Sequence, residues 1–348
     1  MLTKILSLLF SLAVVAAPHA SLPASSLHIY WIDVEGGGAT LVVTPAGEAI
    51  LVDAGWNLDR DASRIHDVAV GVAGVNQIDY FVATHWHADH YGGAIALSKR
   101  MQIKRFFGNG PLAQSVPDDP QFPALMPLYR DLVKDTSVAL RPGDKLAIRQ
   151  PASGPPLQVQ VIASGRKLIG SSGRPATPNP LCSEKEEAKS DPSQNADSVV
   201  LLFQYGSFTF FDGGDLTRAV EQQLVCPINL VGDVELFQID HHGFDLSNPP
   251  VLIHSLHPRV VVVNNGPQKG AEPKTMKTLF STPSIETVWQ VHRNLQAGDH
   301  TNTKPEFIAN QQAENGSKAE FIQATAEPSG ALSIQIGERG TRKSYLPR

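Results

Sequence analysis

The sequence is poor in cysteine, in aromatic side chains and in charge. Two of its 348 residues are cysteines, which excludes a fold stapled by many disulfides and a cysteine-rich zinc module. Charged residues make up 18%, and the net charge is −5, so no stable nucleic-acid partner is expected. No internal repeat is visible, which excludes collagen-like and coiled-coil architectures. A hydrophobic content of 42% instead indicates a globular chain.

The first 20 residues have the features of a signal peptide. Lys4 precedes an apolar stretch at residues 5–17, and small residues follow it. This stretch is too short for a comfortable membrane span, and no longer apolar stretch occurs later. We therefore expect an exported protein, periplasmic or secreted, with cleavage between residues 17 and 24 and no membrane span afterwards. An uncleaved N-terminal anchor is the alternative.

Export affects the interpretation of the two cysteines. In an oxidising compartment, Cys182 and Cys226 are expected to form a disulfide that pins a long loop to the end of a helix. Two free thiols, or a cysteine that binds metal, are the alternatives.

The hydrophobic pattern predicts alternating strands and helices. Strands are expected at 27–34, 39–44, 49–53, 78–84, 103–107, 157–163, 198–204, 208–212, 234–240, 260–264 and 287–291. Helices are expected at 59–75, 93–100, 122–134, 217–225, 250–257 and 274–281. Residues 164–196 form a long loop, and the tail after residue 311 has one further expected strand at 331–336.

One order of elements occurs twice in this pattern. Two strands lead to an aspartate, a helix follows, and the next strand ends in histidine. The first copy contains Asp53 and His85, and the second contains Asp215 and the pair His241 and His242. This order predicts a layered α/β fold with two pseudo-symmetric halves.

A cluster of metal-binding residue types follows the strand at 78–84. His85 and His87 are two residues apart, so in extended chain both rings point the same way and can bind one ion. The chain then turns into a helix, where Asp89 and His90 can face a second ion. Imidazole and carboxylate ligands suit zinc, manganese or iron. A set of surface histidines without metal is the alternative.

These residues resemble a known family. The run His85-x-His87-x-Asp89-His90 resembles the metal-binding motif of the metallo-β-lactamase superfamily. Residues 50–55, 211–216 and 240–243 look like three further motifs of that family. The resemblance implies a four-layer αββα sandwich at residues 25–300, with a C-terminal extension at 301–348 packed on the same domain.

The same resemblance implies roles for individual residues. Asp53 would support the metal loop without binding metal, and Asp215 would bridge two divalent ions, zinc before manganese or iron. Asp89 would bind the second ion and orient the nucleophile. Asp212 is either a second supporting residue or a cap of the following turn. The nucleophile would be a hydroxide activated by the two metals.

The late histidine pair requires separate assignments. Adjacent residues of a strand point to opposite faces, so the two rings are not expected to bind one ion unless the strand has already ended. We expect His242 to be the ligand and His241 to contact the substrate or stabilise the leaving group.

Within the superfamily, the motifs resemble one branch most closely. Asn195-x-x-Ser198 before an apolar strand, followed by Gly-Asp and His-His-Gly, is similar to extracytoplasmic domains of DNA-uptake competence proteins and to phosphorylcholine esterases. These relatives imply hydrolysis of phosphodiesters. Lactam-cleaving members have a further histidine in the middle of the chain, but here none lies between His90 and His241. The first ion would therefore take His85, His87 and Asp215, with Asp197, Asn195 or water.

Other polar residues are weaker candidates. His292 ends the last expected core strand and either enters the pocket or lies on the surface. The stretch 264–267, with Lys269 and Lys274 nearby, either presents amides and a cation to an anion or is a plain turn.

The sequence thus predicts a metal-dependent hydrolase of phosphodiester bonds in a small-molecule or polymer substrate. Hydrolysis of amide, lactone or thioester bonds, β-lactams included, is the first alternative. A non-catalytic metal-binding surface module is the second.

Overall fold

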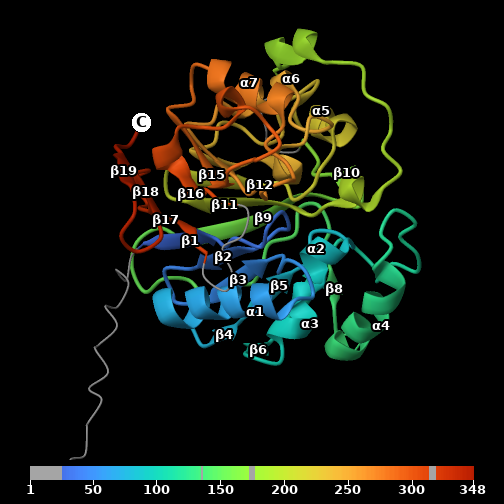
Figure 1. Cartoon of the computed structure of the whole chain (residues 1–348). Helices are drawn as coiled ribbons and strands as arrows, with labels where there is room; N and C mark the ends of the chain where they lie inside the picture. Colours follow the sequence, from blue (N-terminus) through green and yellow to red (C-terminus); the bar gives the residue numbers. More distant parts are fainter. Residues whose placement is uncertain (1–25, 135, 172–176, 313–318) are drawn as a thin grey trace, which may run out of the picture.

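The computed structural model describes residues 26–134, 136–171, 177–312 and 319–348. The expected signal peptide at residues 1–20 lies outside them. Two large sheets face each other at the centre of the molecule, and helices cover the outer face of each (Figure 1). This is the four-layer αββα arrangement, so the predicted fold class is confirmed.

The first sheet contains strands from both ends of the described chain. Its spatial order is β19 (Arg342–Tyr345), β18 (Leu332–Ile336), β17 (Ile322–Ala326), β1 (Leu27–Trp31), β2 (Thr40–Val43), β3 (Ala49–Val52), β5 (Tyr80–Val82), β7 (Phe106–Gly108) and β8 (Val138–Ala139). A small separate pair is formed by β4 (Gln77–Ile78) and β6 (Gln102–Ile103). The outer helices are α1 (Asp59–His66), α2 (Ala88–Tyr91), α3 (Gly93–Leu97) and α4 (Phe122–Val133).

The second sheet is built from the later part of the chain. Its spatial order is β10 (Lys167–Leu168), β9 (Leu157–Ser164), β11 (Val200–Tyr205), β12 (Phe208–Asp212), β13 (Leu236–Gln238), β14 (Val260–Val263), β15 (Thr287–His292) and β16 (Ile308–Asn310). Its outer helices are α5 (Arg218–Val225), α6 (Pro250–Leu256) and α7 (Pro273–Ser281).

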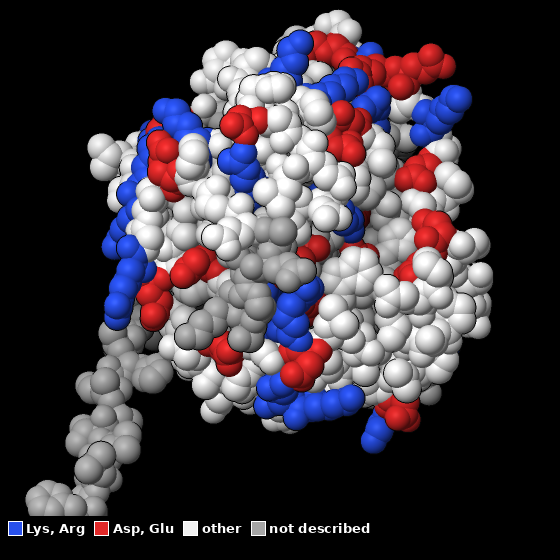
Figure 2. All heavy atoms as spheres, in the orientation of Figure 1, with Lys and Arg blue, Asp and Glu red and all other residues white. Residues whose placement is uncertain are grey.

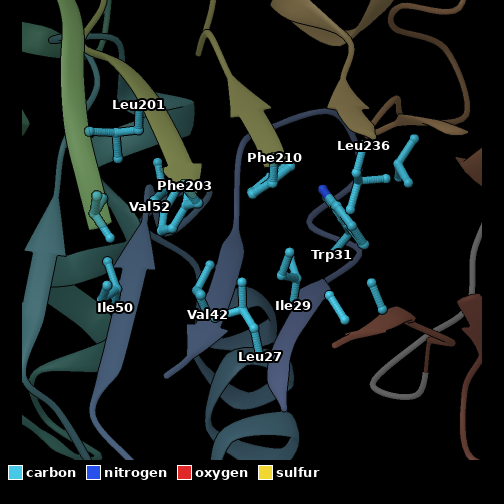
Figure 3. Close-up of a cluster of buried hydrophobic side chains, with 14 of the residues drawn as sticks. Leu27, Ile29, Trp31, Val42, Ile50, Val52, Leu201, Phe203, Phe210 and Leu236 are labelled. Carbon is cyan, nitrogen blue, oxygen red and sulfur yellow. The ribbon is translucent and has the colours of Figure 1, made fainter. Parts of the chain in front are cut away.

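The core between the sheets is apolar and rich in aromatic and β-branched residues. Trp31 of β1 packs edge-on against Phe210 of β12, with ring centroids 5.8 Å apart. Leu236 of β13 lies beside them (Figure 3). Strand β14 consists of four valines that are all buried, as expected for a parallel strand covered on both faces.

The predicted pseudo-symmetry is visible in the strand pairing. In each half, two antiparallel pairings are followed by parallel ones: β1–β2–β3–β5–β7 in the first sheet and β9–β11–β12–β13–β14 in the second. The carboxyl ends of parallel strands meet at one edge of their sheet. Asp53 and His85 follow β3 and β5, and Asp215 and His241 follow β12 and β13 in the same way.

The tail differs most from the prediction. One strand was expected at 331–336, but three strands, β17, β18 and β19, extend the first sheet beside β1. In β17 buried and half-buried residues alternate, so its sequence is less apolar than that of a core strand. The predicted helix at 59–75 is also shorter, because α1 gives way to a π-helical stretch at Asp67–Val72.

The disulfide between Cys182 and Cys226 is present, with Cα atoms 5.7 Å apart, and ties the long loop to the end of α5. Among the described residues, no helix is both long and apolar enough to cross a membrane. On the face drawn in Figure 2, acidic and basic side chains are largely interspersed.

Candidate metal centre

Seven polar side chains from three loops converge where the two sheets meet. Four come from the loop after β5 and the start of α2, one follows β12, and two follow β13. They are His85, His87, Asp89, His90, Asp215, His241 and His242. All except His87 are less than a tenth exposed.

Hydrogen bonds on the outer side of His90 and His242 fix which ring nitrogen carries the proton. His90 Nδ1 is 2.7 Å from an Asp53 carboxylate oxygen, which can only accept. His242 Nδ1 is 3.2 Å from the backbone oxygen of Asn264, which is also only an acceptor. Both Nδ1 atoms therefore donate, and both Nε2 atoms point inward without a hydrogen-bond partner.

The same reasoning applies to His85 and His87. Thr84 Oγ1 donates its proton to Asp53, so it accepts from His85 Nδ1 at 3.0 Å. His87 Nε2 donates to Asp118 at 3.1 Å. The inward atoms, His85 Nε2 and His87 Nδ1, lie 3.1 Å apart, each with a lone pair facing the other. A cation between them would turn this repulsion into coordination.

Asp53 therefore fixes the loop that carries His85 and His90. Its carboxylate accepts from Thr84 N at 2.8 Å and from Thr84 Oγ1 at 2.7 Å, in addition to His90. A carboxylate on the far nitrogen of a histidine orients the ring and makes it a better ligand.

His241 and His242 lie beyond the end of the strand, so the alternation of faces does not apply to them and the stated exception does. Strand β13 ends at Gln238, and both histidines have left-handed φ angles of 51° and 54°. His241 N donates to the Gly214 oxygen at 2.8 Å, and His242 O accepts from Ala271 N at 2.8 Å. These bonds hold a backbone conformation that costs about 1–3 kcal/mol per residue.

As a result, both late histidines reach Asp215. The Nε2 atoms of His241 and His242 lie 3.6 and 3.4 Å from Asp215 Oδ2. Ser247 Oγ donates to the Leu216 oxygen at 2.7 Å, so it accepts from His241 Nδ1 at 3.3 Å. The inward Nε2 of His241 therefore also carries a lone pair.

The histidine nitrogens and carboxylate oxygens of the cluster lie at distances close to those between the ligand atoms of a metal site. His90 Nε2 is 3.2 Å from Asp215 Oδ2 and 3.6 Å from Asp89 Oδ2, and His242 Nε2 is 3.8 Å from Asp89 Oδ2. Ligand atoms of a tetrahedral zinc site are about 3.3 Å apart. Two overlapping groups have their ligand atoms within 4.8 Å of one another: His85, His90 and Asp215, and Asp89, His90 and His242.

Burial and close mutual contact change the pKa values of the histidines and carboxylates in the cluster. Burial lowers the pKa of His85 and lowers that of His241 to about 4. Burial also acts to lower the pKa of His90, but Asp215 and Asp53 outweigh it and raise that pKa. Burial opposes ionisation of Asp215, yet His242 and His90 hold its pKa well below the ordinary range. An ion would replace the proton on His90.

The remaining predicted site residues fall into two groups. Asn195 lies at the cluster, with Nδ2 3.3 Å from His241 Nε2. Asp212 caps the turn after β12 by accepting from Gly214 N at 3.1 Å. Asp197 instead pairs with Arg166 at 2.8 Å, so its carboxylate is not a ligand here. His292 is fully buried, with Nδ1 3.1 Å from the Arg293 oxygen, and does not enter the cluster.

Several supporting residues were missed by sequence reasoning. Asp118 holds His87 from the loop before α4, and its neighbour Asp119 accepts from Ala88 N at 2.7 Å at the start of α2. Asn248 accepts from Asp240 N at 3.1 Å and donates to the Asp240 oxygen at 2.9 Å, which fixes the late histidine loop. The Asp118-Asp119 pair is visible in the sequence, but no spacing links it to His87.

A pocket opens beside His241. Its outer wall is the part of the long loop at residues 187–195, and its inner wall contains Thr217, Arg218, His241 and Leu246. The loop that forms the outer wall is the one tied to α5 by the disulfide. The pocket thus leads from solvent to the cluster.

Residues 33–154 match the family model described as the metallo-beta-lactamase superfamily. This segment, about a third of the chain, is similar to that superfamily. The matched segment contains Asp53 and the run from His85 to His90, and it ends before Asp215. Members of the superfamily are mostly hydrolases. A comparison with curated protein sequences finds no relative.

Solved structures similar to this chain have low sequence identity. CmlA from Streptomyces venezuelae, a diiron beta-hydroxylase, is 14% identical over 76% of this chain and 48% of its own, with a TM-score of 0.39. A diphosphatase of the PhnP family is 10% identical over 77% and 95%, with a TM-score of 0.39. MEM-A1, a subclass B3 metallo-beta-lactamase from a soil metagenome library, is 14% identical over 75% of each chain, with a TM-score of 0.33. The chain spans about half the length of CmlA.

Proposed function

We propose that this protein is an exported hydrolase that uses two divalent metal ions and acts on phosphodiester bonds. The observation that carries the proposal is the shared orientation of five histidines. Each has its outer ring nitrogen occupied by a protein group, and the inner nitrogens of all except His87 lie within 4.0 Å of a carboxylate oxygen of Asp89 or Asp215. Structural histidines satisfy both nitrogens with protein or water, whereas this arrangement is typical of metal ligands.

The donors would divide into two sites that share Asp215, because its Oδ2 lies within 4.0 Å of the inner nitrogens of His85, His90, His241 and His242. The first ion would be held by His85, His87 and His241, which takes the place of the missing intermediate histidine. The second ion would be held by Asp89, His90 and His242. Mixed imidazole and carboxylate donors favour zinc, with manganese and iron as alternatives.

When bound, such ions supply Lewis acidity and a water ionised near neutral pH. The residues of the protein hold the metal ligands and the reacting groups in position. Asp53 and Asp118 fix two of the histidine rings. Asp89 and Asp215 each present Oδ2 to the inner nitrogens and would position the nucleophile. His241, neutral because burial lowers its pKa, presents a lone pair next to the Asn195 amide at the inner end of the pocket.

Support for a phosphodiester substrate comes from the pocket and from the motifs. Its walls carry hydroxyl, amide and cationic side chains, among them Thr217, Asn195 and Arg218, and on the long loop also the carboxylates of Glu187 and Asp191. These groups suit the charged oxygens and polar substituents of a phosphodiester. The series from Asn195 to His242 resembles that of phosphorylcholine esterases.

Support for export comes from the apolar segment at residues 5–17 and from the disulfide. Structural disulfides persist in oxidising compartments and are rare in the cytosol.

The test combines metal analysis with hydrolysis of bis(p-nitrophenyl) phosphate. We expect about two ions per chain and turnover that is lost in the double variant His85→Ala/His87→Ala. His66→Ala is the matched control, because this histidine lies on the surface of α1 beside Asp67. It should keep both metal and turnover.

Two outcomes would contradict the proposal in different ways. Two bound ions without turnover of any phosphodiester would leave the metal centre in place and refute the substrate class. Amide, lactone and thioester substrates would then be tested. A chain that binds no metal under replete conditions would refute the centre itself.

A further inference from the structure

Lys269 contacts the candidate metal centre directly. It lies in the loop between β14 and α7, and its ammonium forms an ion pair with Oδ2 of Asp89. That same oxygen faces the inner nitrogens of His90 and His242 at 3.6 and 3.8 Å. The ammonium therefore contacts the atom that the second metal ion would bind.

An ammonium and a metal ion that both contact this oxygen repel each other. Two unit charges 4 Å apart interact by about 4 kcal/mol near a protein surface, and a divalent ion doubles this value. Binding of the second ion should therefore displace the ammonium from Asp89. The carboxylates of Asp89 and Asp215 offset only half of the charge of two divalent ions, so the loaded centre stays positive.

The stem of Lys269 is held, so the displaced ammonium has little freedom. A Cβ atom at Gly36 would lie 3.1 Å from both Cβ and Cδ of Lys269, which shows how closely the stem packs on that turn. Its ammonium is also 5.8 Å from the ring centre of Trp56. The side chain is 30% exposed, so the ammonium stays at the solvent-facing mouth of the centre. There its three donors are available to an anionic acceptor.

We propose that Lys269 is the anion-binding residue of this site and binds a charged phosphate oxygen of the substrate once the metal ions are in place. The phosphodiester part of this proposal rests on the function proposed above. The binding of a phosphate group does not, because it can be measured without turnover.

The test uses the zinc-loaded full chain and three variants. Lys269→Gln removes the charge, Lys269→Arg restores it, and Lys274→Gln is the matched control. Lys274 lies on α7, is half exposed and pairs with Glu186 at 3.0 Å. Inorganic phosphate binding is followed by calorimetry, the affinity for the second ion by chelator competition, and KM with bis(p-nitrophenyl) phosphate.

We expect Lys269→Gln to weaken phosphate binding by roughly tenfold or more, the loss of one charge-assisted hydrogen bond. KM should rise by a similar factor, with kcat less affected. The second ion should bind at least as tightly as in the wild type, because its competitor is gone. Lys269→Arg should recover most of the phosphate affinity, and Lys274→Gln should match the wild type.

Unchanged phosphate affinity in Lys269→Gln, or a wild type that binds no phosphate at millimolar concentration, would overturn the proposal. Weaker metal binding in Lys269→Gln with normal phosphate affinity would also overturn it and make Lys269 a structural support of Asp89. If the wild type binds phosphate through Lys269 but hydrolyses no phosphodiester, only the proposed substrate class fails.

Discussion

Replacing Asp212 by asparagine should change how the stability of the metal-free protein depends on pH. The carboxyl group of Asp212 is buried behind the cluster, where Oδ1 accepts from Gly214 N and from Gln238 Nε2 at 2.9 Å. Oδ2 has no hydrogen-bond partner among the described residues. Burial is the main reason that the pKa of Asp212 rises from 3.8 to about 7.

The sign follows from proton binding in the two states. Between pH 4 and pH 7 the folded chain keeps a proton on Asp212 that the unfolded chain has lost. The free energy of unfolding therefore falls as the pH rises through this window and levels off above it. A shift of about three pKa units corresponds to a loss of about 4 kcal/mol at pH 8.

Asp212→Asn removes this loss, because the amide never ionises. Its oxygen can keep both hydrogen bonds of Oδ1, but its NH2 group takes the position of Oδ2 and lacks an acceptor, at a cost of about 1–3 kcal/mol. At pH 4 the protonated carboxyl group of the wild type also has a donor without an acceptor at this position, so the two proteins should differ little. At pH 8 the variant should be more stable, by up to about 4 kcal/mol.

Urea unfolding of the chelated protein at pH 4, 6 and 8 measures how the stability difference between variant and wild type changes with pH. Removal of the metal matters, because ions in the centre would favour the charged carboxylate. Asp233→Asn is the control, since that side chain is 74% exposed and its loss should change stability little at any pH. If the stability difference between Asp212→Asn and wild type is the same at pH 4 and pH 8, the carboxyl group does not titrate as argued.

Two other perturbations have clear expected results. Because the disulfide spans 44 residues, Cys182→Ser/Cys226→Ser should lower the free energy of unfolding by about 4 kcal/mol in urea titrations, and an unchanged midpoint would contradict this estimate. Asp53→Asn removes the carboxylate that orients His90. It should weaken the binding of one of the two metal ions about 10–100-fold, measured by chelator competition. Equal affinities in variant and wild type would show that this contact does not orient a ligand.

The sequence predicted the parts of the site that depend on strand order. His85, His87, Asp89 and His90 follow one another in the chain directly after a buried strand, so their convergence needs little tertiary information. The return of the same pattern before Asp215 indicated where the second half of the site would come from.

The parts that were not predicted depend on loops. The face of His241 could not be derived from strand alternation, because the strand ends three residues earlier and the chain enters a left-handed conformation. Asp118 and Lys269 reach the cluster from loops whose paths are set by packing, and no periodic pattern encodes such paths. Of the tail strands, β18 was predicted, whereas β17 and β19 were missed because their apolar patterns are weaker than those of the central strands.

The two halves share a topology, yet they use equivalent aspartates differently. Asp53 follows β3 and Asp212 ends β12, at matching places in the two sheets. In the first half, histidines follow the next strand directly at the edge of the sheet. Asp53 therefore contacts His90, which partners its charge. In the second half two glycines follow the aspartate and place Asp215 at the cluster instead, which leaves Asp212 facing Gln238 with one oxygen unpartnered. The symmetric scaffold thus supplies two positions, and the residues that follow each position decide which carboxylate serves the metal centre.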